Sequence, residues 1–235
     1  MRKLLLPAAA LLCATSAFAS MCQPGTLQGY INLGVGGCDL GAAHVNDFML
    51  EPGQSFATPI DPATIQVTPD GTASARSLIF TVGATAGPFD LLESFFRFNV
   101  AAQLSQAFIS LGSPSATGNG VVIGVLDVCA GGSFPDGVPT NCPSNSDSRV
   151  VFATATDSFL ADSMTFPVTS FFDVFVDLTA DGGLNGTALL NSATVGVGVG
   201  AAVPEPSMAL GIAAGLGLII LYKLRRNRRA NFRRL

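Results

Sequence analysis

The stretch Ser170–Leu178, SFFDVFVDL, decides the fold because its aliphatic side chains recur at every second position. Val174, Val176 and Leu178 are separated by aspartate or phenylalanine. A period of two places these three side chains on one face of a β-strand, whereas a helix would scatter them. The next segment, TADGGLNGT (179–187), contains Gly-Gly and Asn-Gly, and Asn-Gly between two alternating segments is a strong hairpin signal.

The alternation continues after this turn and recurs elsewhere in the chain. Val195, Val197 and Val199 are again two residues apart. Four further runs are rich in β-branched and aromatic residues and are bounded by Gly, Pro, Ser or Asp: SLIFTVG (77–83), ESFFRFNV (93–100), GVVIGVLDV (120–128) and SRVVFAT (148–154). The segments PFDLLESFFRF (88–98) and AAQLSQAFISL (101–111) fit a helix about as well as a strand.

Turn-forming residues are spread along the whole chain. The 14 prolines and 26 glycines argue against long helices. Short strands separated by turn clusters are typical of all-β domains. The sequence therefore predicts a mainly β exported domain over residues 20–202, with an antiparallel β-sandwich or jelly-roll-like fold.

The N-terminal residues have the three-part layout of a secretory signal peptide. Arg2 and Lys3 precede an apolar run, and small residues follow in ATSAFAS (14–20). The apolar run is shorter than the roughly 20 residues that a membrane-spanning helix needs. We predict a signal peptide over residues 1–19 that is cleaved between Ala19 and Ser20.

Charge is distributed very unevenly. The stretch 20–203 carries Arg76, Arg97 and Arg149 as its only basic residues against 15 acidic ones, a formal charge of 3 − 15 = −12. Binding to phosphate depends on Lys and Arg. The composition therefore excludes nucleic acid as a partner of this domain and predicts repulsion from anionic lipid.

The cysteines predict disulfides. Cys13 leaves with the signal peptide, and the remaining four fall into two local pairs, Cys22 with Cys38 and Cys129 with Cys142. An even number of cysteines in an exported chain favours disulfides, although four cysteines allow three connectivities. We expect the local pairs, because each closes a Gly-rich loop at a gain of roughly 3 kcal/mol. No C-x-x-C spacing occurs, so we expect no cysteine metal site.

Candidate catalytic residues are few. His44, the single histidine of the chain, has Asp47 close by in GAAHVNDF, but no serine lies in a G-x-S-x-G motif. A lone histidine without such a context is more often a surface or packing residue than a catalytic base. The glycine-rich segments GVGG and GNGVVIG do not match a nucleotide-binding fingerprint. We therefore predict neither catalysis nor a cofactor.

Asp173, Asp177 and Asp181 are candidate calcium ligands because carboxylates are the oxygens that this ion prefers. Asp173 and Asp177 are four residues apart on one strand face, about 13 Å, which is too far for one ion to bridge. The simpler interpretation places them on the solvated face of the strand. Asp181, followed by two glycines, could belong to a loop site.

The C-terminal segment, VPEPSMALGIAAGLGLIILYKLRRNRRANFRRL (203–235), combines three elements. A proline-bracketed glutamate comes first, an apolar run predicts a transmembrane helix at about 208–222, and a basic end follows. The apolar run is marginal for crossing the ~30 Å hydrocarbon core. The arginines after it predict a cytoplasmic C-terminus. The glycines in the run lower its helix propensity, which suits a permanent anchor poorly.

This order of elements resembles the PEP-CTERM sorting signal of Gram-negative bacteria, which exosortase recognises. The resemblance covers residues 203–235 only, and its motif residues correspond to Pro204, Glu205 and Pro206. It implies processing near this motif by an exosortase-type membrane enzyme, with release or transfer of the body to the cell surface. Many members of the family are associated with exopolysaccharide and biofilm matrix. A plain anchor with a proline-containing stalk remains the alternative.

The sequence thus predicts an exported, non-enzymatic protein of the cell surface or extracellular matrix, with an inner-membrane intermediate. A secreted polysaccharide-binding module and an unprocessed, membrane-anchored surface protein are the alternatives. Against the binding module, the chain has no Trp and only two tyrosines, Tyr30 and Tyr222. The 17 phenylalanines are expected to fill the core.

Overall fold

The computed structural model describes residues 20–71, 75–135, 139 and 141–198. The predicted signal peptide with Ala19, the Pro204–Pro206 motif and the predicted membrane helix at 208–222 lie outside the described residues. Among the residues that are described, no helix is long and apolar enough to cross a membrane.

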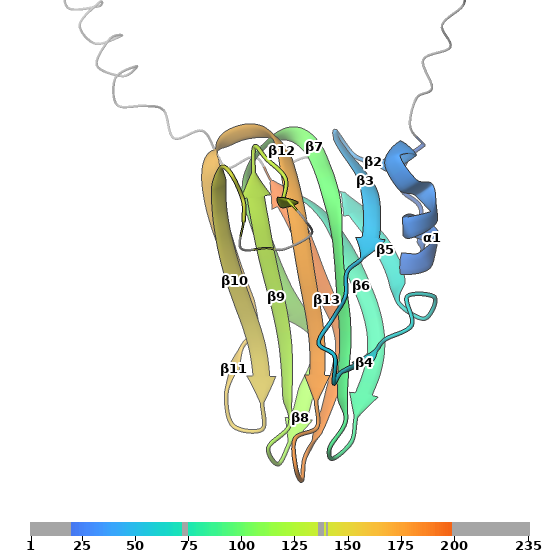
Figure 1. Cartoon of the computed structure of the whole chain (residues 1–235), viewed down its shortest axis with the longest axis vertical. Coiled ribbons are helices and arrows are strands. Elements are labelled where there is room, and N and C mark those ends of the chain that lie inside the picture. The colour runs from blue at the N-terminus through green and yellow to red at the C-terminus, as the bar shows by residue number, and fades with distance from the viewer. Residues whose placement is uncertain (1–19, 72–74, 136–138, 140, 199–235) are drawn as a thin grey trace, which may run out of the picture. The chain divides into compact units, whose positions relative to one another are not determined.

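The described domain consists of strands, one short α-helix and one 3-10 turn (Figure 1). In chain order they are β1 (Gly25–Thr26), α1 (Leu27–Leu33), η1 (Gly34–Gly36), β2 (Cys38–Leu40), β3 (Ala43–Leu50), β4 (Thr58–Pro59), β5 (Gln66–Gly71), β6 (Ala75–Ala86), β7 (Leu91–Gly112), β8 (Ser115–Thr117), β9 (Val121–Ala130), β10 (Asn145–Thr154), β11 (Ser158–Phe159), β12 (Ala161–Asp181) and β13 (Thr187–Gly198).

The strands form two packed layers. The front layer contains β3, residues 91–101 of β7, residues 171–181 of β12, β9 and β10, hydrogen-bonded in that order. The back layer contains β5, β6, β13, residues 104–112 of β7 and residues 161–169 of β12. All of these pairs are antiparallel, so the predicted antiparallel β-sandwich is confirmed.

The two longest strands join the layers. β7 has 22 residues and β12 has 21, and each contributes one half to each layer. The β7–β12 register shifts between Thr165 and Phe171, and irregularities of this kind bend a strand. Figure 1 shows both strands arching over the same end of the sandwich. Both segments with ambiguous helical spacing lie mostly in β7, where paired strands on either side favour the extended backbone.

The core lies between the layers and is rich in phenylalanine, as expected. Phe80 of β6 and Phe96 of β7 are both fully buried, with ring centroids 4.9 Å apart. Burying such a side chain contributes about 1.5–3 kcal/mol. At Gly124 of β9, an added Cβ would lie 3.2 Å from Ile109 and 3.3 Å from Leu111 on the back half of β7. A glycine here lets the two layers approach closely.

The sequence signals for individual strands are confirmed. All four further runs lie within β6, β7, β9 and β10 except for Gly120, which directly precedes β9, and the Gly-Gly/Asn-Gly segment forms the turn between Asp181 and Thr187. Val195 and Val197 are buried on β13. Helix α1 was not predicted; it begins at Thr26, whose hydroxyl caps the helix by accepting a hydrogen bond from the Gly29 N–H at 3.0 Å.

Both predicted disulfides are present, Cys22–Cys38 and Cys129–Cys142. The first encloses helix α1, and the second encloses the loop between β9 and β10. Since disulfides persist in oxidising compartments, this pairing supports an extracellular or periplasmic location.

Both ends of the described domain lie at the arched end of the sandwich. Ser20 accepts a hydrogen bond from Asp39 of β2, beside the part of β3 that pairs with Ala101, and Gly198 pairs with Gln106. The β6–β7 and β12–β13 turns lie at the opposite end (Figure 1).

Candidate ligand-binding site

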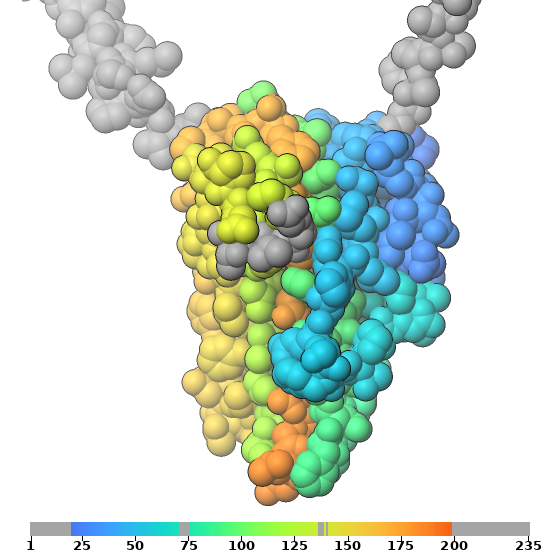
Figure 2. Space-filling view, in the orientation of Figure 1, coloured from blue at the N-terminus to red at the C-terminus, as the bar shows by residue number. Residues whose placement is uncertain are grey.

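Two loops cover part of the outer face of the front layer. The first covering loop, residues 51–65, connects β3 to β5 and includes β4. The second covering loop connects β9 to β10 and is described at residues 131–135, 139 and 141–144. Figure 2 shows β7 and β12 at the surface between the two loops. The outward side chains of these strands therefore form a floor between two walls.

Glu93 of β7 anchors the first covering loop. The residue is only 5% exposed, and its Oε2 accepts a hydrogen bond from the Gln54 backbone N–H at 2.6 Å. The preceding residue, Gly53, has no room for a side chain, because an added Cβ would collide with the Glu93 carboxylate. A hydrogen bond from a backbone N–H to a charged acceptor is stronger than a hydrogen bond between two neutral groups. Glu93 is therefore a structural residue of this loop.

Asp173 of β12 anchors the second covering loop in the same way. Its Oδ2 accepts a hydrogen bond from the Phe134 backbone N–H at 2.8 Å, and its side chain is 3% exposed. The other carboxylate oxygen, Oδ1, is buried and has no hydrogen-bond partner. A buried polar atom without a partner costs about 1–3 kcal/mol, so such atoms often mark ligand sites.

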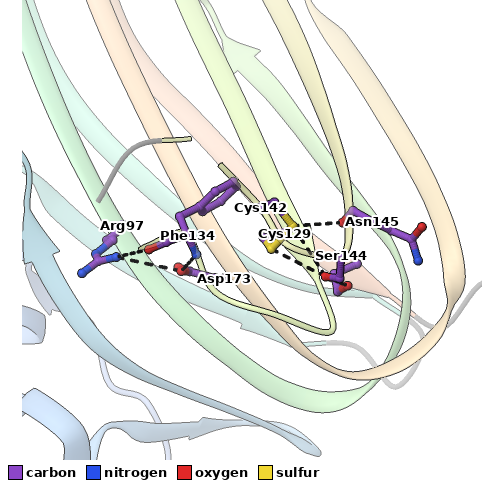
Figure 3. The surroundings of a disulfide bond; sticks show 8 residues. Arg97, Cys129, Phe134, Cys142, Ser144, Asn145 and Asp173 are labelled. Atoms are coloured by element: carbon purple, nitrogen blue, oxygen red, sulfur yellow. Dashed lines mark hydrogen bonds and ion pairs between the residues drawn. A yellow bond between two sulfur atoms is a disulfide. The ribbon is translucent and has the colours of Figure 1, made fainter. Parts of the chain in front are cut away.

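Arg97 of β7 contacts both covering loops. Figure 3 shows its contacts with Phe134 of the second loop and with Asp173. Its Nε lies 2.7 Å from Oε1 of Glu51 in the first loop. Its Nη1 donates to the Phe134 carbonyl at 3.4 Å and lies 4.0 Å from Asp173 Oδ2. One guanidinium therefore holds the two walls of the site at a fixed separation.

A small aromatic cluster on the outer face supports the second covering loop. Phe175 of β12 is fully buried there, with its ring centroid 4.9 Å from that of Phe95 and 5.6 Å from that of Phe134. The Cys129–Cys142 disulfide packs against the same cluster. Covalent and apolar contacts thus fix the position of Phe134, whose backbone contacts Asp173 and Arg97.

The space beside these residues is the polar pocket, about 290 Å³ in volume. It is lined by Asp47, Arg97, Asn99, Ser133, Phe134, Phe171 and Asp173. Asp47 has a φ of 57°, in the left-handed region, and accepts a 3.4 Å hydrogen bond from Asn99 Nδ2. The pocket therefore combines carboxylate acceptors, amide and guanidinium donors, a hydroxyl and aromatic rings.

A second hollow, the loop pocket, has a volume of about 460 Å³ and lies under the first covering loop. Its lining is more apolar. It consists of Leu50, Glu51, Gly53, Gln54, Ala57, Pro59, Ile60, Asp61, Pro62, Glu93, Ser94 and Phe95.

Burial shifts the titration of the carboxyls on this face. It raises the pKa of Asp173, and nearby Asp47 raises it further, while the Phe134 N–H, Arg97 and, more weakly, the Val174 N–H act in the opposite direction. Burial also raises the pKa of Glu51, although Arg97 lowers it.

Asp177 lies between the two walls, opposite Phe95 of β7 and Val125 of β9. Burial raises the pKa of this carboxyl to about 6, with Glu93 and Asp127 adding to the effect. The Thr179 hydroxyl, which donates to Asp177 Oδ1 at 2.9 Å, lowers it.

The structure corrects one expectation about the candidate calcium ligands. The three β12 aspartates do not share a solvated face, because the second covering loop buries Asp173 to 2% exposure. Asp181 Oδ1 accepts a hydrogen bond from the Gly183 N–H at 2.7 Å within the turn. Across the described parts of the chain, no group of three metal-ligating His, Cys, Asp or Glu residues occurs.

His44 pairs with Asp39 and not with Asp47. Its Nδ1 lies 2.9 Å from Asp39 Oδ1, across the β2–β3 hairpin. Asp47 instead lines the polar pocket. Arg97, Asn99 and Phe134 are site residues that no sequence motif indicated, and the scarcity of basic residues was the one signal that could have singled out Arg97.

No family model and no curated protein matches the chain. Among solved structures, it is similar to the carbohydrate-binding module TmCBM61 in complex with β-1,4-galactotriose, at 12% identity and a TM-score of 0.24, over 56% of this chain and 86% of that one. It is also similar to endoglucanase 3 of Trichoderma harzianum, from family GH12, at 14% identity and a TM-score of 0.22, over 64% of this chain and 97% of that one. At these TM-scores neither structure assigns a fold, a ligand or an activity to this chain.

Proposed function

We propose that this chain is an exported, non-enzymatic protein of the cell surface or extracellular matrix that binds neutral polysaccharide at the polar pocket. The observation that carries the proposal is the Asp173 carboxylate, which lines the pocket while its Oδ1 is buried without a partner. A sugar hydroxyl would supply the missing donor once the pocket side chains shift to uncover Oδ1, which is buried in the unliganded protein. A new hydrogen bond to this acceptor would remove the free-energy cost of leaving it unpaired, about 1–3 kcal/mol.

Charge favours a neutral ligand. Asp47 and Asp173 line the pocket with one cation, Arg97, which is already paired with Glu51. The net charge of −12 (3 − 15) over residues 20–203 adds long-range repulsion of anions. Polysaccharides rich in uronic acid or sulfate are therefore disfavoured. A metal cation is opposed by the Arg97 guanidinium, 4.0 Å from the Asp173 carboxylate.

The remaining pocket residues suit a sugar ring. Carboxylates accept from hydroxyls, while Asn99 and Arg97 can donate to hydroxyl oxygens. The partly exposed ring of Phe171 offers an apolar surface to the C–H face of a sugar. Ligand sites commonly combine a few such polar groups with an aromatic wall.

In this proposal the site binds polysaccharide without cleaving it. Three carboxylates line the loop pocket: Glu93 is held by the Gln54 N–H, Glu51 by Arg97, and Asp61 by the Ala63 N–H. Glycoside hydrolysis requires one carboxyl that is free to transfer a proton and a second that assists the reaction. All three groups here have structural partners that would compete with that role.

The C-terminal segment supplies the proposed route to the surface. Under this proposal an exosortase-type enzyme processes the chain near Pro204-Glu205-Pro206, after an inner-membrane intermediate. The support is the order of motif, apolar run and basic end in residues 203–235. Processing of this kind would place the polysaccharide-binding domain outside the cell.

The test is binding of the protein, isolated from its host, to a panel of neutral and uronic-acid polysaccharides. We expect neutral polymers to bind, and Asp173→Asn to weaken binding roughly 10- to 100-fold, as for a hydrogen bond to a charged group. The amide oxygen of the variant can still accept from the Phe134 N–H, which preserves the loop anchor. Asn191→Ala, an exposed change on β13 in the back layer, is the matched control.

Two results would overturn the proposal: no binding of any neutral polymer, or full binding by Asp173→Asn. Release of reducing sugar from a bound polymer would contradict the non-enzymatic part alone.

A further inference from the structure

The polar pocket and the loop pocket share a wall. Glu51 lines the loop pocket, Arg97 lines the polar pocket, and these two residues form the 2.7 Å ion pair. Both pockets also use the same strand as their floor: Arg97 and Asn99 of β7 in one case, and Glu93 to Phe95 in the other. The two hollows are therefore neighbours along β7.

The distance along this floor is long for a single sugar. From Glu93 to Asn99 the strand advances six residues, or about 20 Å at roughly 3.3 Å per residue. One hexose ring fills only part of that length, while an oligosaccharide of several units can cover it. Figure 2 shows the strip of β7 and β12 between the covering loops as open surface.

The rim of the loop pocket carries an exposed aromatic residue. Phe56 is 74% exposed, in contrast to the buried phenylalanines of the core. It lies in a turn closed by the Ala57 N–H, which donates to the Gln54 carbonyl at 3.0 Å, and both Gln54 and Ala57 line the pocket. The core does not account for a phenylalanine at this place. An aromatic ring at the mouth of a pocket can stack on the apolar face of a sugar.

We infer that the two pockets form one extended site that takes an internal stretch of a linear, neutral polysaccharide several units long, with Phe56 as the stacking platform at the loop-pocket end. This inference rests on the proposed function, because it assigns the polymer class to the same site. The sugar in the polar pocket hydrogen-bonds to Asp173 and Asn99. The following units cross over the Arg97–Glu51 pair toward Ile60 and Phe95.

The test measures affinity against chain length, using the full-length chain and soluble cello- and manno-oligosaccharides of one to six units. We expect the affinity to rise at least about tenfold from one to four units and then to level off, since each unit that extends from one pocket to the other adds contacts. Phe56→Ala should weaken binding of the four-unit ligand about 3- to 10-fold, as for loss of an aromatic contact, and leave the one-unit ligand within about twofold.

The matched control is Phe159→Ala, because Phe159 is also an exposed phenylalanine, at 45% exposure. It lies on β11, which is separated from β7 in the sheet by β12, β9 and β10. This variant should leave both affinities unchanged. The extended site would be overturned by equal affinity for ligands of one and six units, or by a Phe56→Ala variant that binds the four-unit ligand as tightly as the wild type. Either result would leave polysaccharide binding itself intact. Absence of binding to every neutral oligosaccharide would overturn both proposals together.

Discussion

Arg97 Nε lies 2.7 Å from Glu51 Oε1, and this ion pair joins the wall of one pocket to the wall of the other. The same guanidinium donates to the Phe134 carbonyl at 3.4 Å. Residues 20–203 contain only two other basic residues, Arg76 and Arg149. The position of Arg97 in a strongly acidic domain therefore links the stability of the covering loops to the geometry of the site.

Replacement of Arg97 by alanine should destabilise the protein by about 1–3 kcal/mol, because Glu51 and Asp173 lose their cation in a largely buried setting. The measurement is the free energy of unfolding in urea at pH 7. Arg149→Ala is the control, because its partners Asp147 and Asp162 are more exposed than Glu51 and Asp173. The Arg149→Ala variant should lose less than about 1 kcal/mol of its free energy of unfolding. Equal losses for the two variants would contradict the role given to Arg97.

The raised pKa of Asp177 predicts a pH dependence of stability. In the folded protein this carboxyl titrates at about 6, against an ordinary value of 3.8. Between these values the folded state binds more protons than the unfolded chain, so the free energy of unfolding falls as the pH rises from about 4 to about 6 and then levels off. Asp177→Asn should remove this part of the slope and stabilise the protein at pH 7.5 by up to about 1–2 kcal/mol.

Urea unfolding at pH 4.5 and pH 7.5 provides the check. Asp61→Asn serves as the control, because Asp61 is an exposed carboxylate whose Oδ1 accepts from the Ala63 N–H, a bond that asparagine can retain. An Asp177→Asn variant with the same pH slope as the wild type would show that this carboxyl does not carry the effect.

The two disulfides should differ in their effect on binding. Replacing Cys129 and Cys142 together with alanine removes a loop constraint of roughly 3 kcal/mol and frees the loop that carries Phe134. We expect lower stability and a loss of polysaccharide affinity of at least about tenfold, since Phe134 and Ser133 line the polar pocket.

The Cys22, Cys38 double alanine variant is the control for that experiment. It removes a similar constraint from a segment that lines neither proposed pocket. It should lose comparable stability and keep its affinity, as long as binding is measured at a temperature where it remains folded. Equal losses of affinity would indicate that binding responds only to overall stability.

Local patterns predicted the elements of this fold well. The alternation in SFFDVFVDL and the Asn-Gly turn depend on neighbouring residues, and both are confirmed in β12 and the turn that follows it. The two disulfides also join cysteines that are near one another in the sequence, and both predicted pairs are confirmed. A strand of 22 residues that serves both layers could not be predicted, because its bend depends on pairing with β12 and β13.

The candidate site was much less accessible from sequence. Asp47, Arg97, Ser133 and Asp173 are separated by tens of residues and come together only when β3, β7 and β12 align and the second covering loop folds over them. Asp173 illustrates the difficulty. On the strand alone it alternates with valines like a solvated residue, and only the backbone N–H of Phe134 shows why a carboxylate is buried there.

Processing at the tail gives the last prediction. Replacing Pro204, Glu205 and Pro206 with alanine should leave the chain unprocessed in its native host, because the Pro-Glu-Pro motif is the feature proposed for recognition. Whole-protein mass spectrometry and cell fractionation then should find the longer chain retained in the inner membrane, while the wild type reaches the surface or the medium. Asn227→Ala, which preserves the motif, the apolar run and the basic residues, should be processed normally. A triple variant that matches the wild type in mass and location would contradict processing at this motif and favour the alternative of a plain membrane anchor.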